Sequence, residues 1–127
     1  MDEHPNAAVV RKMGEAMMSN DPQASAAFLA DDIEWHEIGR AEPIRGKAAL
    51  ADRFMGGVPP DWKITGLEIH DIIANDDHTV ALGTATATRG GKTLTYRTAE
   101  IYHIRDGKVT ARWSFSDDTA AINEFFG

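Results

Sequence analysis

The sequence predicts an α+β fold in which helices come first and antiparallel strands follow. Near the start of the chain, apolar residues recur at helical spacing, as Val10, Met13 and Met17. In the second half, long strand-like runs are separated by turn signals. Two of these signals, Gly90-Gly91 and Asp106-Gly107, are typical of tight β-hairpins.

Each element follows from a local signal. Pro22 suits the first turn of a helix, and Asp117-Asp118-Thr119 can cap a short last helix. The third helix should bury Leu50 and Phe54. The expected helices are residues 5–19, 22–29 and 46–55, and the expected long strands are residues 63–74, 79–89, 92–104 and 108–116. A shorter strand should precede the third helix and carry Ile33, Trp35 and Glu37.

The hairpin turns also predict which side chains share a face, because directly opposed residues of an antiparallel pair do so. The second turn should pair Tyr102 with Ala111, Glu100 with Trp113, and Thr98 with Phe115. One face would then collect Leu94, Tyr96, Tyr102, Ile104, Val109, Trp113 and Phe115, with Glu100 in their midst. The other face would carry threonines, Arg97, His103 and Arg112, with Val80, Leu82 and Ile101 as its apolar part. A bulge would flip part of this assignment.

Composition limits the possible functions. The 127 residues suit a single domain, residues 1–127, with a core of its own. The net charge of -7 argues against nucleic acid or an anionic membrane as partner. The chain has no cysteine, which excludes disulfides and thiolate chemistry. Its first residues do not resemble a signal peptide, and no apolar run approaches the roughly 20 residues of a membrane span, so we expect a cytoplasmic protein.

The strand that carries Ile33, Trp35 and Glu37 holds the first candidate for a functional carboxyl. Alternation places these three side chains on one face, so Glu37 ends an apolar stripe. This pattern predicts an acid or base at a hydrophobic pocket, with Trp35 as a wall. The alternative is that Glu37 lies exposed at the strand end and that Trp35 only fills the core.

This arrangement resembles the nuclear-transport-factor-2-like superfamily, and within it the SnoaL-like and ketosteroid-isomerase-like proteins. The resemblance covers nearly the whole chain. Its most specific segment is Ala30-Asp-Asp-Ile-Glu-Trp-His-Glu-Ile-Gly39, followed by Glu42-Pro43 and Gly46, and Arg105-Asp-Gly-Lys-Val109 is a second. The resemblance implies a cystatin-like roll, in which a strongly curved mixed or antiparallel sheet wraps around the helices and encloses a conical pocket. It also implies a homodimer through the outer face of the sheet.

The resemblance further implies roles for two glutamates. Glu37 falls where ketosteroid isomerases keep a catalytic aspartate base, and Glu100 falls near their protonated carboxyl, which donates to the developing oxyanion. The tyrosine that this family keeps on its first helix is replaced by Met13, and Tyr96 and Tyr102 are the candidates to substitute for it.

We therefore expect a cofactor-free isomerase, cyclase or lyase that acts by proton transfer on a small apolar carbonyl compound, with Glu37 as base and Glu100 as donor. The residues expected to contact the ligand are Trp35, Met13, Met17, Phe54, Tyr96, Tyr102, Trp113 and Phe115. No metal is expected, since the five histidines lack the spacing of a metal site. The alternative is a module that binds a small apolar or aromatic ligand, or dimerises, without catalysis. Glu100 would then form an ion pair with Arg97 or Arg112 at an edge.

Overall fold

The computed structural model describes residues 3–19, 22–55 and 61–126. Their elements follow the expected order along the chain. They are α1 (Pro5–Met18), α2 (Pro22–Ala26), β1 (Leu29–His36), β2 (Ile44–Arg45), α3 (Lys47–Met55), β3 (Trp62–Ala74), β4 (Thr79–Arg89), β5 (Lys92–Arg105), β6 (Lys108–Phe115) and α4 (Thr119–Phe126). Within these ranges, no helix combines the length and the apolar composition that crossing a bilayer requires.

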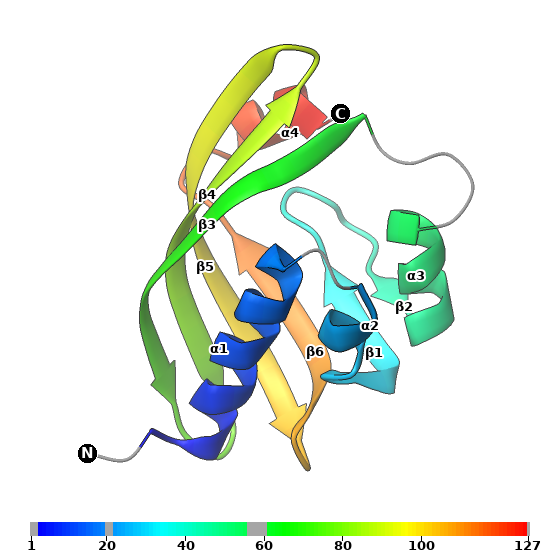
Figure 1. Cartoon of the computed structure of the whole chain (residues 1–127), viewed down its shortest axis with the longest axis vertical. Helices are drawn as coiled ribbons and strands as arrows, with labels where there is room; N and C mark the ends of the chain where they lie inside the picture. Colours follow the sequence, from blue (N-terminus) through cyan, green and yellow to red (C-terminus); the bar gives the residue numbers. More distant parts are fainter. Residues whose placement is uncertain (1–2, 20–21, 56–60, 127) are drawn as a thin grey trace.

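The strands form one mixed sheet in the order β2-β1-β6-β5-β4-β3. Only β1 and β6 run parallel, and the other described neighbours are antiparallel. The long strands curve, and α1 lies across the concave face of the sheet (Figure 1). The last helix, α4, lies near the first residues of β3 and the last residues of β4. The predicted α+β fold with a curved mixed sheet is therefore confirmed.

The core lies where α1 meets the inner face of the sheet. Val10 and Met13 of α1 are almost fully buried, and they pack with Ile33 of β1 and with Tyr102 and Val109 of the last two strands. On β4, the residues that face this core are small, which lets the helix approach the sheet closely; they are Ala81, Gly83, Ala85 and Ala87.

The first predicted hairpin has the expected register. Glu100 lies opposite Ala81, Thr98 opposite Gly83 and Tyr96 opposite Ala85. The residues of β5 and β4 therefore divide between the two faces as expected, because no bulge interrupts this pair of strands.

The second hairpin differs from the prediction because β6 contains a bulge. Ile104 lies opposite Val109 as expected, but His103 lies opposite Ala111, so Thr110 is an extra residue. The hydroxyl of Thr110 donates to the carbonyl oxygen of His103 at 3.2 Å. One inserted residue moves every later side chain to the other face of the sheet.

The predicted pairing of Trp113 and Phe115 is therefore wrong. Arg112 and Ser114 take the inner face, opposite Tyr102 and Glu100 respectively. Trp113 lies outside and stacks on His36 with the ring centres 5.0 Å apart. Phe115 is 53% exposed.

The boundary between α2 and β1 also differs from the prediction. The helix ends at Ala26, and Leu29, which was expected to be helical, begins the strand. Leu29 pairs with Val109 of the parallel strand β6, and the amide of Val109 donates to the carbonyl oxygen of Phe28 at 2.8 Å. These long-range contacts outweigh the local helical pattern.

Candidate functional site

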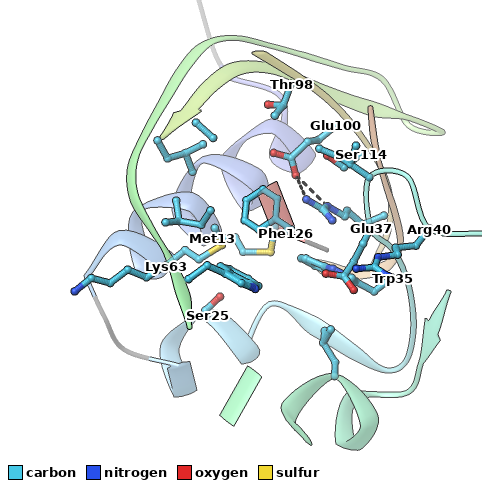
Figure 2. A pocket seen from close by; sticks show the side chains of 18 of the residues that line it. Met13, Ser25, Trp35, Glu37, Arg40, Lys63, Thr98, Glu100, Ser114 and Phe126 are labelled. Atoms are coloured by element: carbon cyan, nitrogen blue, oxygen red, sulfur yellow. Dashed lines mark hydrogen bonds and ion pairs between the residues drawn. The ribbon is translucent and has the colours of Figure 1, made fainter. Parts of the chain in front are cut away.

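A cavity of about 620 Å³ lies between the inner face of the sheet and the helices that cover it. This volume is in the range of roughly 300 to 1,000 Å³ that small-molecule pockets occupy. Most of its wall is apolar, and its larger lining side chains include Met13, Met17, Trp35, Trp62, Tyr96 and Phe126. Figure 2 shows this wall with the polar side chains that interrupt it.

Several of the residues expected at the site line this cavity together. They are Glu37, Glu100, Trp35, Met13, Met17 and Tyr96. Tyr102 is buried, at 5% exposure, and reaches the site through its hydroxyl. Phe54 belongs to α3, but its side chain lies outside the described residues. Trp113 and Phe115 lie on the other face of the sheet.

One oxygen of Glu100 receives three hydrogen bonds. Nη2 and Nε of Arg112 donate to Oε2 at 2.7 and 3.0 Å, and the hydroxyl of Tyr102 donates to the same oxygen at 3.0 Å. The two charged side chains are only 15% and 14% exposed. Oε2 of Glu100 is thus an acceptor of charge-assisted hydrogen bonds inside the cavity. The expected alternative, pairing with Arg112, does occur, but within the cavity wall.

Arg112 is also held from its other side. Its guanidinium carbon lies 4.1 Å from the centre of the Trp35 ring, and its Nη1 donates to the carbonyl oxygen of His36 at 3.2 Å. Burial opposes the charge of Arg112, but Glu100 and Tyr102 outweigh that effect and raise the pKa of the guanidinium. A guanidinium has five N–H groups. The bonds to Glu100 and His36 use Nε and one hydrogen on each terminal nitrogen, which leaves one further hydrogen on each terminal nitrogen.

The same surroundings affect the tyrosines. Burial raises the pKa of the Tyr102 hydroxyl, and the negative charge of Glu100 raises it further. Burial and Glu100 also raise the pKa of Tyr96. Both hydroxyls therefore stay protonated well above neutral pH.

Ser114 adds an unused polar group to the wall. It is 6% exposed, lies directly across from Glu100 in the strand pairing, and lines the cavity. Its hydroxyl has no hydrogen-bond partner in the part of the chain that the structure describes. A buried hydroxyl without a partner carries a free-energy cost, which a ligand oxygen could relieve.

Glu37 lies at the rim of the cavity, directly after β1, and is half-buried. Figure 2 shows it on the same side as Trp35 and Arg40. Two more cationic side chains, Lys47 of α3 and Lys63 of β3, line the cavity as well. Within the described ranges, no group of three or more histidine, aspartate or glutamate side chains is placed to hold a metal ion.

Sequence reasoning missed Arg112 and Ser114 as site residues. The bulge at Thr110 decides their side of the sheet, and no turn residue marks it in the sequence. The Asp106-Gly107 turn predicts the register correctly as far as Val109. It does not predict the bulge, which comes later in the strand.

The outer face of the sheet carries an apolar cluster, which we define as Leu82, Ile101, Trp113 and Phe115. Leu82 and Phe115 are 38% and 53% exposed. The ring of His103 meets Trp113 edge to face at 4.8 Å.

Comparison with known proteins agrees with the overall fold. Residues 10–112 match the family model of the SnoaL-like domain. The chain is similar to Bal32a from a soil-derived mobile gene cassette, with 24% identity over 97% of both chains and a TM-score of 0.80. It is also similar to an NTF2-like protein of Burkholderia pseudomallei, with 20% identity over 98% of both chains and a TM-score of 0.82.

A third similar structure is TerC, which was co-crystallised with polyporic acid. It shares 23% identity over 97% of this chain and 98% of TerC, with a TM-score of 0.77. At such identities the likeness shows the fold. None of the curated proteins compared with the chain matches it.

Proposed function

This chain belongs to the SnoaL-like domain family, and we propose that it is a cofactor-free enzyme that moves a proton on a small apolar carbonyl compound. The reaction would be an isomerisation, a cyclisation or an elimination. One observation carries the proposal: a mostly apolar cavity holds the carboxyl of Glu37 at its rim and the spare N–H groups of Arg112 in its wall. TerC, co-crystallised with polyporic acid, supports a small organic ligand in this fold.

The proposed step needs a base and a cation. Glu37 takes a proton from the carbon next to the carbonyl group, and the C–H electron pair moves so that the carbonyl oxygen becomes an enolate. Arg112 faces that oxygen with its spare N–H groups and stabilises the charge that develops there. The proton then returns from Glu37 to the same or another carbon, which restores the carboxylate.

In this proposal Glu100 and Tyr102 are positioning residues. The three hydrogen bonds to Oε2 of Glu100 fix the guanidinium of Arg112 against the ring of Trp35. A cation held in a fixed geometry within an apolar wall stabilises a developing charge without reorganising.

The test is deuterium exchange of 2-tetralone, an apolar aromatic ketone, followed by NMR in D2O. The protein should accelerate exchange next to the carbonyl above the buffer rate, and Glu37→Gln should lower the acceleration by about 100-fold. Glu68→Gln is the matched control, because Glu68 is a strand residue whose side chain is 77% exposed and does not line the cavity.

A second candidate is a binding module of the same fold without catalysis. It is favoured by Met13, which lines the cavity and has no hydroxyl where the ketosteroid isomerases keep a tyrosine. If 2-tetralone binds, as shift changes of lining residues would show, but exchanges only at the buffer rate, the binding module is the correct account.

We also propose that the protein forms a homodimer through the outer face of the sheet. The apolar cluster Leu82, Ile101, Trp113 and Phe115 supports this, because an exposed apolar patch is commonly an interaction site. Sedimentation should give a dimer mass, and Phe115→Ser should shift the equilibrium toward monomer. A monomer mass that does not change with concentration would contradict the dimer.

A further inference from the structure

We propose that the substrate is an anionic carbonyl compound, an apolar oxo acid, whose carboxylate stays at the rim of the cavity among Arg40, Lys47 and Lys63. This inference rests on the proposed function, because it names the substrate of the same cavity. It adds a charged group, which the proton transfer itself does not require.

The first support is the charge of the lining. Among the described lining residues, four are cationic and two are acidic. Arg112 and Glu100 neutralise each other through their ion pair. The remaining lining charges are three cations and Glu37, on a chain whose net charge is -7. The net charge of the lining residues is therefore positive, whereas the net charge of the whole chain is negative.

The second support is that these cations have no ion-pair partner among the residues that the structure describes. Arg11, Arg45, Arg89 and Arg97 form ion pairs with acidic side chains. Arg40, Lys47 and Lys63 form none within the described part of the chain. A cation at the edge of an apolar cavity can gain a partner when a carboxylate binds there.

The third support is position. Arg40 lies in the loop after β1, Lys47 is the first residue of α3, and Lys63 lies on β3. Arg40 and Lys63 are exposed and still line the cavity, so they mark its opening. Figure 2 shows Arg40 beside Glu37 and Trp35, and Lys63 on the other side of the cavity with its ammonium group pointing outward. These cations therefore attract an anion as it approaches the opening.

The interior supplies the other end of the substrate site. Arg112 and Ser114 both line the cavity, and the guanidinium of Arg112 and the hydroxyl of Ser114, which has no partner among the described residues, are donors suited to a ketone oxygen. The apolar body of the substrate would contact Trp35, Met13 and Phe126. The ketone thus points inward, and the carboxylate remains at the wet rim, where its desolvation costs little.

The test uses two probes that differ only in charge, 4-oxo-4-phenylbutanoate and its neutral primary amide. At low ionic strength the carboxylate should bind about tenfold more tightly than the amide, as titration calorimetry would show, and the preference should shrink in about 0.5 M salt. The variant Arg40→Gln/Lys47→Gln/Lys63→Gln should lose the preference and keep its affinity for the amide.

A second triple variant distinguishes the effect of the cations at the cavity from the effect of the net charge of the protein. Lys12→Gln/Lys92→Gln/Arg105→Gln changes the net charge equally, but these exposed residues do not line the cavity. It should keep most of the preference for the carboxylate. Equal losses in the two triple variants, or equal binding of the two probes to the unmodified protein, would overturn the oxo-acid inference and leave the proposed function intact. If neither probe nor 2-tetralone binds, the proposed function itself fails.

Discussion

Tyr102 and Arg112 lie opposite each other on β5 and β6, and both donate to the same oxygen of Glu100. This arrangement exists because the bulge at Thr110 brings Arg112 to the inner face of the sheet. It makes an ion pair part of a mostly apolar wall, and the effect of this pair on stability can be measured.

Removing only the cation of the ion pair between Glu100 and Arg112 should lower the stability of the protein. Arg112→Met leaves the carboxylate of Glu100 little exposed and without its cation, so we expect a loss of about 3–5 kcal/mol in the free energy of unfolding. The double variant Glu100→Gln/Arg112→Met removes both charges and should regain about 2 kcal/mol of that loss. Urea unfolding measures both values. Equal stabilities of the single and double variants would show that the charge of Glu100 is not what destabilises Arg112→Met.

The tyrosines should make the protein sensitive to alkaline pH. Burial raises the pKa of Tyr102, and the charge of Glu100 raises it further, so the folded state keeps a proton that the unfolded state loses near pH ~10. The stability that this provides is fully present below about pH 10 and falls as the pH rises further.

Urea unfolding between about pH 9 and pH 11 checks this sign, and Tyr102→Phe should flatten the decline. Because the chain has only two tyrosines, absorbance at alkaline pH gives an independent reading. A native protein in which both tyrosines titrate near pH ~10 would contradict the prediction.

Two buried hydroxyls without described partners should be dispensable for stability. Ser114→Ala and Thr79→Val each remove such a group, and each should raise the free energy of unfolding by about 1 kcal/mol. Only Ser114 lines the cavity. Ser114→Ala should therefore weaken the binding of 4-oxo-4-phenylbutanoate, whereas Thr79→Val should not. Unchanged binding in Ser114→Ala would remove Ser114 from the site.

Gly83 should not tolerate a side chain. A Cβ at this position would lie 2.8 Å from the carbonyl oxygen of Glu68, which is backbone and cannot move aside easily. We expect Gly83→Ala to cost about 1–3 kcal/mol in unfolding free energy. Gly66→Ala is the matched control, because a Cβ at position 66 would lie 3.6 Å from the nearest atom, which belongs to the side chain of Thr86. It should cost less than about 1 kcal/mol. Similar losses in both variants would mean that crowding at Gly83 is not the cause.

The bulge itself can be removed. Deleting Thr110 restores the register of a regular hairpin and would turn Arg112 outward and Trp113 inward. We expect a loss of more than about 3 kcal/mol and loss of ligand binding. Thr110→Val keeps the chain length and removes only the hydrogen bond to the carbonyl of His103, so it should cost about 1 kcal/mol. A deletion variant that binds ligand normally would contradict the role of the bulge.

The sequence alone determined the order of the elements and the register of the first hairpin, because helical spacing and turn residues are local signals. Strand parity also placed Glu100 on the inner face of the sheet, because no bulge interrupts β4 and β5, and the family resemblance led us to expect Glu37 and Trp35 at the same cavity. Only the tertiary structure decided that Arg112 and Ser114 complete the site and that Trp113 and Phe115 leave it. The physical reason is the period of two in a strand: a single bulged residue, held by contacts distant in sequence, exchanges the two faces for all residues that follow.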